Sequence, residues 1–218
     1  MENKLREACA NGNIEEVKKL LNEQTVIENP KWKTIPFETA CSEGYLEIAE
    51  LLLNDQGLEV NKGNRSKATP FWIACSKGQV EIVKLLLSDQ RVDINQAKSN
   101  YQTPFYIACW KGHIEVVKVL LASERDININ QQCNKKKTAL EISKTRSNTI
   151  RRSRWETPEE FQIAKTNCSF IVTLIESYQK NPKETQFQLR KEVEYRIYLF
   201  IYLFIYLFIY LFIYFNLI

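Results

Sequence analysis

The sequence contains a single histidine, and its six glycines are scattered rather than clustered. We find no catalytic constellation around His113, although histidine is the commonest acid–base group in enzymes. No glycine-rich loop offers amides to a phosphate, and no set of cysteines and histidines has zinc-ligand spacing. We therefore predict a protein that is not an enzyme and uses no cofactor and no metal. His113 directly follows a glycine, so we expect it to pack or hydrogen-bond in a turn.

The sequence also has little excess of one charge over the other, because its net charge is only +4 over 218 residues. A balance this mild does not favour nucleic acid as the partner of the whole molecule. The first residues, Met1-Glu2-Asn3-Lys4-Leu5-Arg6-Glu7, contain no apolar segment. We therefore expect no N-terminal secretory signal and synthesis in the cytosol.

The chain is organised around a segment that occurs twice. The first copy begins at Thr69 and the second begins 34 residues later, at Thr103. Each copy has threonine followed by proline, as at the start of a helix, and an apolar stretch that ends at Gly78 or Gly112. A second run with helical periodicity follows each glycine. The unit is thus helix, turn, helix, and weaker copies at 4–22, at 33–61 and from Thr138 indicate an array.

The repeated pattern Thr-Pro-Phe-x-Ile-Ala-Cys-x-x-Gly-x-x-Glu-x-Val-Lys-x-Leu-Leu resembles the ankyrin repeat family. The resemblance implies an all-α solenoid of stacked helix–turn–helix units joined by short hairpin-like loops, over about residues 2–178. We place about five repeats, with an insertion near 148–157 in the last, at 2–32, 33–65, 66–99, 100–134 and 135–178.

The sequence departs from the family pattern at two positions in each repeat. The family's histidine, which hydrogen-bonds the threonine, is replaced by Glu38, Trp72, Tyr106 and Glu141. We expect Trp72 and Tyr106 to fill space between first helices. The family's glycine two residues before the threonine is replaced by Lys67, Tyr101 and Lys136. We therefore expect the hairpin turns to be relaxed or differently shaped.

Four cysteines occupy the same place in successive units, spaced 32, 34 and 34 residues apart: Cys9, Cys41, Cys75 and Cys109. Stacked units place equivalent Cα atoms roughly 10 Å apart, beyond the ~7 Å limit of a disulfide. We expect these side chains to act as small apolar groups, whereas thiol or metal chemistry would require rapid labelling by a thiol reagent. Cys133 and Cys168 lie outside this register, and nothing nearby in the sequence activates them.

After the last repeat, Thr157-Pro158-Glu159-Glu160 predicts a capped helix that Asn181-Pro182 would end. We expect its second half to close the stack, 179–196 to form a charged linker, and 197–218 to form an apolar low-complexity helix. Residues 197–215 repeat Ile, Tyr, Leu and Phe without a charge, and a helix this long would span ~28 Å.

Two interpretations of the tail are open. Arg190, Lys191 and Arg196 precede it, which favours a membrane anchor with the stack on the cytoplasmic face. However, tyrosines run through its whole length, and the perfect four-residue period is typical of a translated simple nucleotide repeat. The second interpretation is therefore an artefactual or non-anchoring tail on a soluble adaptor.

The resemblance implies that a partner protein is bound by the hairpin tips and the exposed ends of the first helices. By register, these positions are Lys31, Trp32, Arg65, Ser66, Lys77, Ser99, Asn100, Gln102, Trp110, Lys111, Asn134 and Lys135. Tryptophan and arginine are enriched in binding hot spots. For Trp110, a contact with the partner and packing onto a neighbouring repeat both remain open.

Residues 135–154 contain eight Lys or Arg and one acid, Glu141. Such a run suits a solvated loop, and also contact with anionic lipid, an acidic partner or RNA. We predict a protein–protein interaction module or scaffold, with a membrane contact through 197–215 in the anchored interpretation. The alternative is a fragment of a larger ankyrin-containing enzyme or channel.

Overall fold

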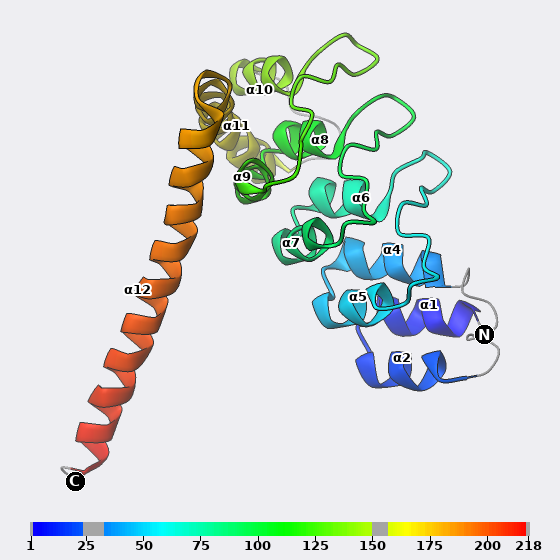
Figure 1. The fold of residues 1–218 in the computed structure, drawn as a ribbon, viewed down its shortest axis with the longest axis vertical. Coiled ribbons are helices and arrows are strands. Elements are labelled where there is room, and N and C mark those ends of the chain that lie inside the picture. The colour runs from blue at the N-terminus through cyan, green and yellow to red at the C-terminus, as the bar shows by residue number, and fades with distance from the viewer. Residues whose placement is uncertain (1, 24–32, 150–156, 217–218) are drawn as a thin grey trace.

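The computed structural model describes residues 2–23, 33–149 and 157–216, and this part of the chain is helical, without a strand (Figure 1). The predicted all-α solenoid is confirmed. Its helices are α1 (Glu2–Ala10), α2 (Ile14–Leu21), α4 (Thr34–Glu43), α5 (Leu46–Leu53), α6 (Pro70–Lys77), α7 (Val80–Ser88), α8 (Pro104–Lys111), α9 (Ile114–Ala122), α10 (Ala139–Asn148), α11 (Pro158–Lys180) and α12 (Pro182–Asn216).

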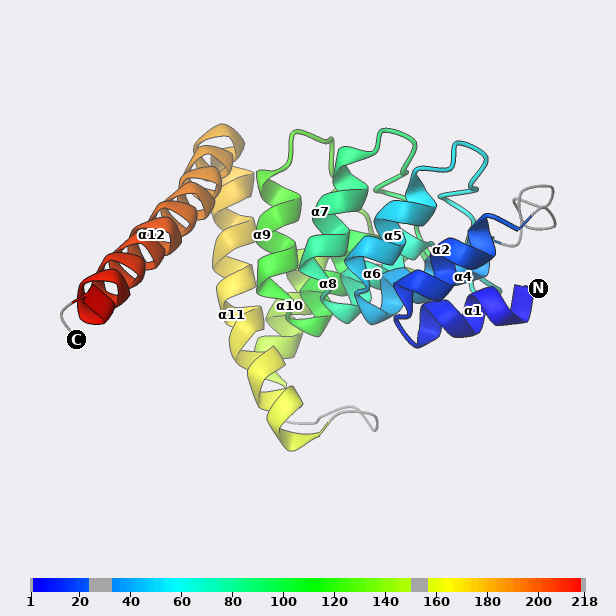
Figure 2. The same ribbon diagram turned by 90° about the horizontal axis from the view of Figure 1, so that it is seen from below.

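The helices form two parallel rows, which Figure 2 shows side by side. The first helices of the repeats, α1, α4, α6, α8 and α10, pack in sequence along one row. The second helices, α2, α5, α7 and α9, pack along the other, and α11 continues that row. Each unit therefore contacts only its neighbours, as in other solenoids.

The predicted helix starts and ends are present in the central repeats. The Thr69 hydroxyl accepts a hydrogen bond from the Trp72 amide at 3.1 Å, and Thr103 does the same for Tyr106 at 3.1 Å. These bonds satisfy amides that have no partner within the first turn of a helix. Gly78 and Gly112 end α6 and α8 with φ of 76°, a left-handed conformation that glycine adopts without strain.

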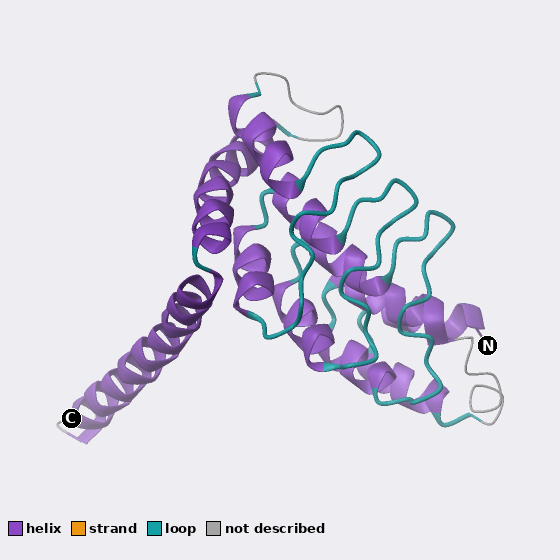
Figure 3. Ribbon diagram, turned by 45° about the horizontal axis from the view of Figure 1, so that its top comes forward, coloured by secondary structure: helices purple, strands orange, loops and turns teal. Residues whose placement is uncertain are grey.

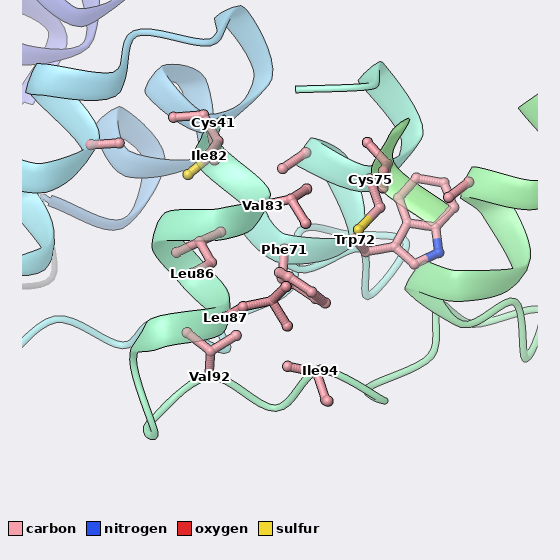
Figure 4. Close-up of a cluster of buried hydrophobic side chains, with 14 of the residues drawn as sticks. Cys41, Phe71, Trp72, Cys75, Ile82, Val83, Leu86, Leu87, Val92 and Ile94 are labelled. Atoms are coloured by element: carbon pink, nitrogen blue, oxygen red, sulfur yellow. The ribbon is translucent and has the colours of Figure 1, made fainter. Parts of the chain in front are cut away.

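The core lies between the two rows. Figure 4 shows Phe71 from α6 among Val83 and Leu87 from α7, and Phe37, Phe71 and Phe105 are at most 2% exposed. Burial of a side chain of this size contributes roughly 1.5–3 kcal/mol. As predicted, Trp72 and Tyr106 are buried between first helices, and the in-register cysteines pack as small apolar groups with exposures of 0%.

Arginines at the ends of the second helices join successive repeats. Arg91 donates to the carbonyl oxygens of Leu53 at 2.6 Å and Asp55 at 3.0 Å, at the end of α5. Arg125, 34 residues later, donates to Leu87 at 3.1 Å at the end of α7. Each guanidinium thus satisfies carbonyls that a helix end leaves without a partner. In the same way, Arg190 of α12 donates to the Ala122 carbonyl of α9 at 2.9 Å.

The C-terminal region confirms one prediction and corrects another. Helix α11 starts at the predicted capping box, stops before Asn181, and buries Ile171 and Ile175. Residues 182–196, however, are not a linker but the first part of α12, which lies along α9. Leu189 is only 6% exposed, and Lys118 of α9 forms an ion pair with Glu192 at 2.7 Å. The linker prediction failed because the charges of this segment are matched by charges on α9, which the sequence alone does not show.

The remainder of α12 extends away from the stack (Figure 1). Its described apolar side chains are exposed, including Tyr198, Phe200 and Tyr202 at 67–72%. Within the described residues, no helix offers a segment long and apolar enough to cross a membrane. The predicted transmembrane anchor therefore gains no support. The predicted domain boundaries stay predictions.

Candidate protein-binding surface

Three long loops project in a row from one edge of the stack (Figure 3). Their ends, which we call the tips, are residues 61–68, 95–102 and 130–137. Each tip is closed by a backbone hydrogen bond of 3.0–3.1 Å: Asn64 to Ala68, Lys98 to Gln102, and Cys133 to Lys137. The predicted hairpin-like turns are thus present, with no strand in the described part of the chain.

The tips are bonded to one another as well as to the helices. The Ser99 amide donates to the Ser66 carbonyl at 3.0 Å, and the Asn134 amide donates to Asn100 at 3.0 Å. The Trp72 indole donates to the Gln102 carbonyl of the next tip at 2.9 Å. Trp72, which stands at the family's histidine position, therefore supports the tip of the next repeat. The three tips form one preorganised row, which reduces the entropy lost when a partner binds.

The prediction that the turns are relaxed or differently shaped is wrong. Lys67, Tyr101 and Lys136 have φ of 61°, 61° and 55°, which is the left-handed conformation that glycine favours. Side chains in this conformation cost about 1–2 kcal/mol per residue. The turns keep it because their amides donate within the tip, at 2.7 Å from Lys67 to Asn64 and 2.8 Å from Tyr101 to Lys98.

These three residues are candidate contacts that the sequence-based list omitted. Lys67, Tyr101 and Lys136 are exposed at the turns, Tyr101 by 61%. The available signal was the loss of glycine at a position where the family keeps it. Residues in strained conformations cluster at functional sites, which makes these three positions candidates.

The tips carry positive charge without acids. Seven Lys or Arg and no Asp or Glu occur in the three segments: Lys62, Arg65, Lys67, Lys98, Lys135, Lys136 and Lys137. Arg65, Lys67, Lys135 and Lys136 are exposed and form no ion pair within the described part of the chain. Lys62 is paired with Glu59 at 2.6 Å, and the Lys98 ammonium lies 4.9 Å from the Trp72 ring.

The structure brings most of the predicted contact residues together at this edge. Arg65, Ser99, Asn134 and Lys135 are exposed on the tips. The other three, Ser66, Asn100 and Gln102, are half-buried. The carbonyls of Ser66 and Asn100 accept the bonds that join the tips, and the Gln102 carbonyl accepts from Trp72 of α6. Lys31 and Trp32 lie outside the described residues.

The remaining predicted residues lie at the opposite edge of the stack. We call it the glycine edge, because glycines such as Gly78 and Gly112 end the first helices there. Lys77 and Lys111 end α6 and α8 and line a cavity of about 340 Å³ with His113, Glu160 and Asn167. Trp110 is half-buried, and its ring lies 5.9 Å from the guanidinium of Arg146 on α10. Arg146 is 6% exposed and also lies 5.2 Å from the Phe161 ring. The structure thus places this indole against a neighbouring repeat, while its role toward a partner stays a prediction.

Side chains at the glycine edge hold successive repeats together. The residue after the glycine donates to the preceding first helix, as Gln79 does to Ser42 at 2.9 Å. The His113 Nε2 atom lies 3.0 Å from the Ser76 carbonyl, so its predicted hydrogen-bonding role is confirmed. Burial lowers the pKa of His113, the bond to Ser76 opposes this, and nearby Lys111 lowers it further. Neutral His113 is therefore a structural donor.

The thiols of the four in-register cysteines are poor nucleophiles, because a raised pKa keeps them protonated. Burial raises the pKa of Cys9 to about 12, and also raises the pKa of Cys41, Cys75 and Cys109. Burial also opposes ionisation of Cys133, but hydrogen bonds from Tyr106 and the turn amides lower its pKa below the ordinary value. Within the described residues, no group of three His, Cys, Asp or Glu side chains is placed to hold a metal ion.

A family model described as ankyrin repeats (3 copies) matches residues 39–133, the region of α4 to α9 and the first two tips. The chain is an ankyrin repeat protein. No curated protein matches it. Ankyrin repeats typically serve as non-enzymatic interaction domains and generally bind other proteins. In this ankyrin repeat protein, the tips combine exposed side chains with a backbone that is fixed by hydrogen bonds.

Proposed function

We propose that this ankyrin repeat protein is a non-enzymatic binding module that holds a partner protein through its hairpin tips and the adjoining face of the first helices. The observation that carries the proposal is the row of tips, in which cross-tip hydrogen bonds fix exposed residues in advance. A fixed surface binds with a smaller loss of entropy than a mobile one. The partner is captured at the tips, without chemical change.

Site-specific photo-crosslinking tests the proposal. A photoreactive amino acid replaces the exposed Ser99 on the central tip, or the exposed Glu50 on α5 as a control on the row of second helices. After irradiation in cells, we expect the Ser99 probe to form a discrete adduct with another protein and the Glu50 probe to form none. Equal crosslinking from both positions, or none from Ser99, would contradict the proposal.

The proposal includes a location on the cytoplasmic side, supported by six buried cysteines that form no disulfide in the described part of the chain, as suits a reducing compartment. Cell fractionation of the full chain and of residues 1–196 tests it, because the shorter form keeps the part of α12 that packs on α9. We expect both forms in the cytosolic fraction. Retention of the full chain alone in carbonate-washed, detergent-releasable membranes would instead assign α12 to a membrane.

A further inference from the structure

The chemistry of the partner can be inferred from the charge of the tips. Four exposed cations, Arg65, Lys67, Lys135 and Lys136, form no ion pair within the described residues. Exposed acidic residues directly precede two of the tips: Glu59 precedes 61–68 and Asp93 precedes 95–102. The positive surface is therefore a narrow strip along the ends of the loops, rather than a broad face. A narrow strip fits a single extended chain better than a wide polyanion.

We infer that the tips bind an extended, acidic segment of the partner protein, with Lys67, Tyr101 and Lys136 as its central contacts. This inference rests on the proposed function. The three residues stand at the same position of successive tips and are exposed in the left-handed conformation. Two cations thus flank one aromatic ring, which offers apolar contact area at a small loss of side-chain entropy.

The spacing of the tips sets the spacing of the acids. Neighbouring helices pack 8–10 Å apart, so successive tips stand roughly 10 Å apart. An extended chain advances about 3.3 Å per residue, so about three residues separate side chains that reach successive tips. The fitting segment therefore carries Asp or Glu opposite the two outer tips, about six residues apart, with an apolar side chain between them that faces Tyr101.

Protein is favoured over nucleic acid as the source of this negative charge. Single-stranded nucleic acid is held by several aromatic rings on which successive bases stack. Among the described tip residues, Tyr101 is the one aromatic side chain, and its neighbours at the same position are lysines. The ankyrin repeats of this chain also belong to a class that generally binds proteins.

The test is a fluorescence anisotropy titration of the full chain with a dye-labelled peptide of about twelve residues, carrying Glu residues about six positions apart and Leu midway between them. Lys67→Asn/Lys136→Asn removes two charges, and Asn tolerates the left-handed conformation. Lys180→Asn/Lys183→Asn removes two exposed charges near the junction of α11 and α12 and serves as the matched control. We expect the tip variant to bind about tenfold more weakly and the control to change less than about twofold.

Equal weakening in both variants would overturn the inference, because net charge alone would then explain the affinity. Tighter binding of oligouridylate, or of vesicles containing phosphatidylserine, would assign the tips to RNA or lipid instead. If the peptide fails to bind while the Ser99 probe still crosslinks a protein, the acidic segment is wrong and the protein-binding function stands. If both fail, the proposed function fails as well.

Discussion

The two edges of the stack use the same backbone conformation with opposite residue choices. At the glycine edge, Gly12, Gly44, Gly78 and Gly112 have positive φ, which costs glycine almost nothing. At the tips, Lys67, Tyr101 and Lys136 adopt positive φ in spite of their side chains. One edge has the residue that best stabilises the fold. The other keeps side chains that lower stability and are available to a partner.

The largest effect is expected where a side chain is added at the glycine edge. A Cβ atom at Gly112 would lie 2.8 Å from backbone atoms of Ala164 on α11, so the helix would have to move. With the left-handed penalty, Gly112→Ala should lower the free energy of unfolding by about 3 kcal/mol in urea denaturation. At Gly44 the nearest atoms belong to the flexible Gln79 side chain, so Gly44→Ala should lose less. Equal losses would contradict this explanation.

A smaller loss is expected when a tip loses its support from a first helix. Trp72→Phe removes the hydrogen bond to the Gln102 carbonyl and should cost about 1–2 kcal/mol of unfolding free energy. Tyr106→Phe is the matched control, since the Tyr106 hydroxyl lies 3.5 Å from the Cys133 sulfur, which is a weaker partner than a carbonyl oxygen. We expect that control to lose less than Trp72→Phe. Hydrogen exchange at Ser99 and Gln102 would show whether the tip itself loosens.

Removal of one hydrogen-bond donor at the glycine edge should lower the free energy of unfolding by about 1 kcal/mol. His113→Ala leaves the Ser76 carbonyl without its partner, whereas His113→Gln supplies an amide like that of Gln79 one repeat earlier. Denaturation should therefore show most of the loss restored in His113→Gln. If both variants lose the same amount, the ring packs against its neighbours but its hydrogen bond contributes little.

The smallest effect is a pH dependence confined to the glycine edge. Burial in the folded state lowers the pKa of His113 below that of an ordinary histidine, so protonation favours the unfolded chain. The corresponding stability is complete above the unfolded pKa and is lost as pH falls through the folded pKa. Between about pH 7.5 and pH 5, wild type should lose more stability than His113→Gln. A parallel loss in both proteins would assign the effect to other groups.

Features encoded within one repeat were predictable from the sequence. Thr69, Thr103 and Thr157 act as N-caps, and α11 ends before Asn181, because these signals act within a few residues. The burial of the in-register cysteines followed from the repeat itself. Register alone also predicted which residues lie on the three described tips, whereas their contact with a partner stays a prediction.

Features that depend on contacts between repeats were not predictable. The packing of α12 on α9 requires Lys118 and Glu192 to meet across 74 residues of sequence. The alignment of the tips with one another depends on cross-tip bonds, such as the one from the Ser99 amide to the Ser66 carbonyl, which join residues far apart in the sequence. The contact of Trp110 with Arg146 likewise depends on how α10 packs against α8. A local sequence pattern does not encode contacts between residues of different repeats.

The most direct test of the account is the urea-induced unfolding of the triple variant Lys67→Gly/Tyr101→Gly/Lys136→Gly beside wild type. Glycine removes the left-handed penalty but loses more entropy on folding, so the three sites together should gain about 2 kcal/mol. Such a gain would show that the tips keep these side chains at the expense of stability. An unchanged or lower free energy of unfolding would contradict the claim that the two edges differ in this way.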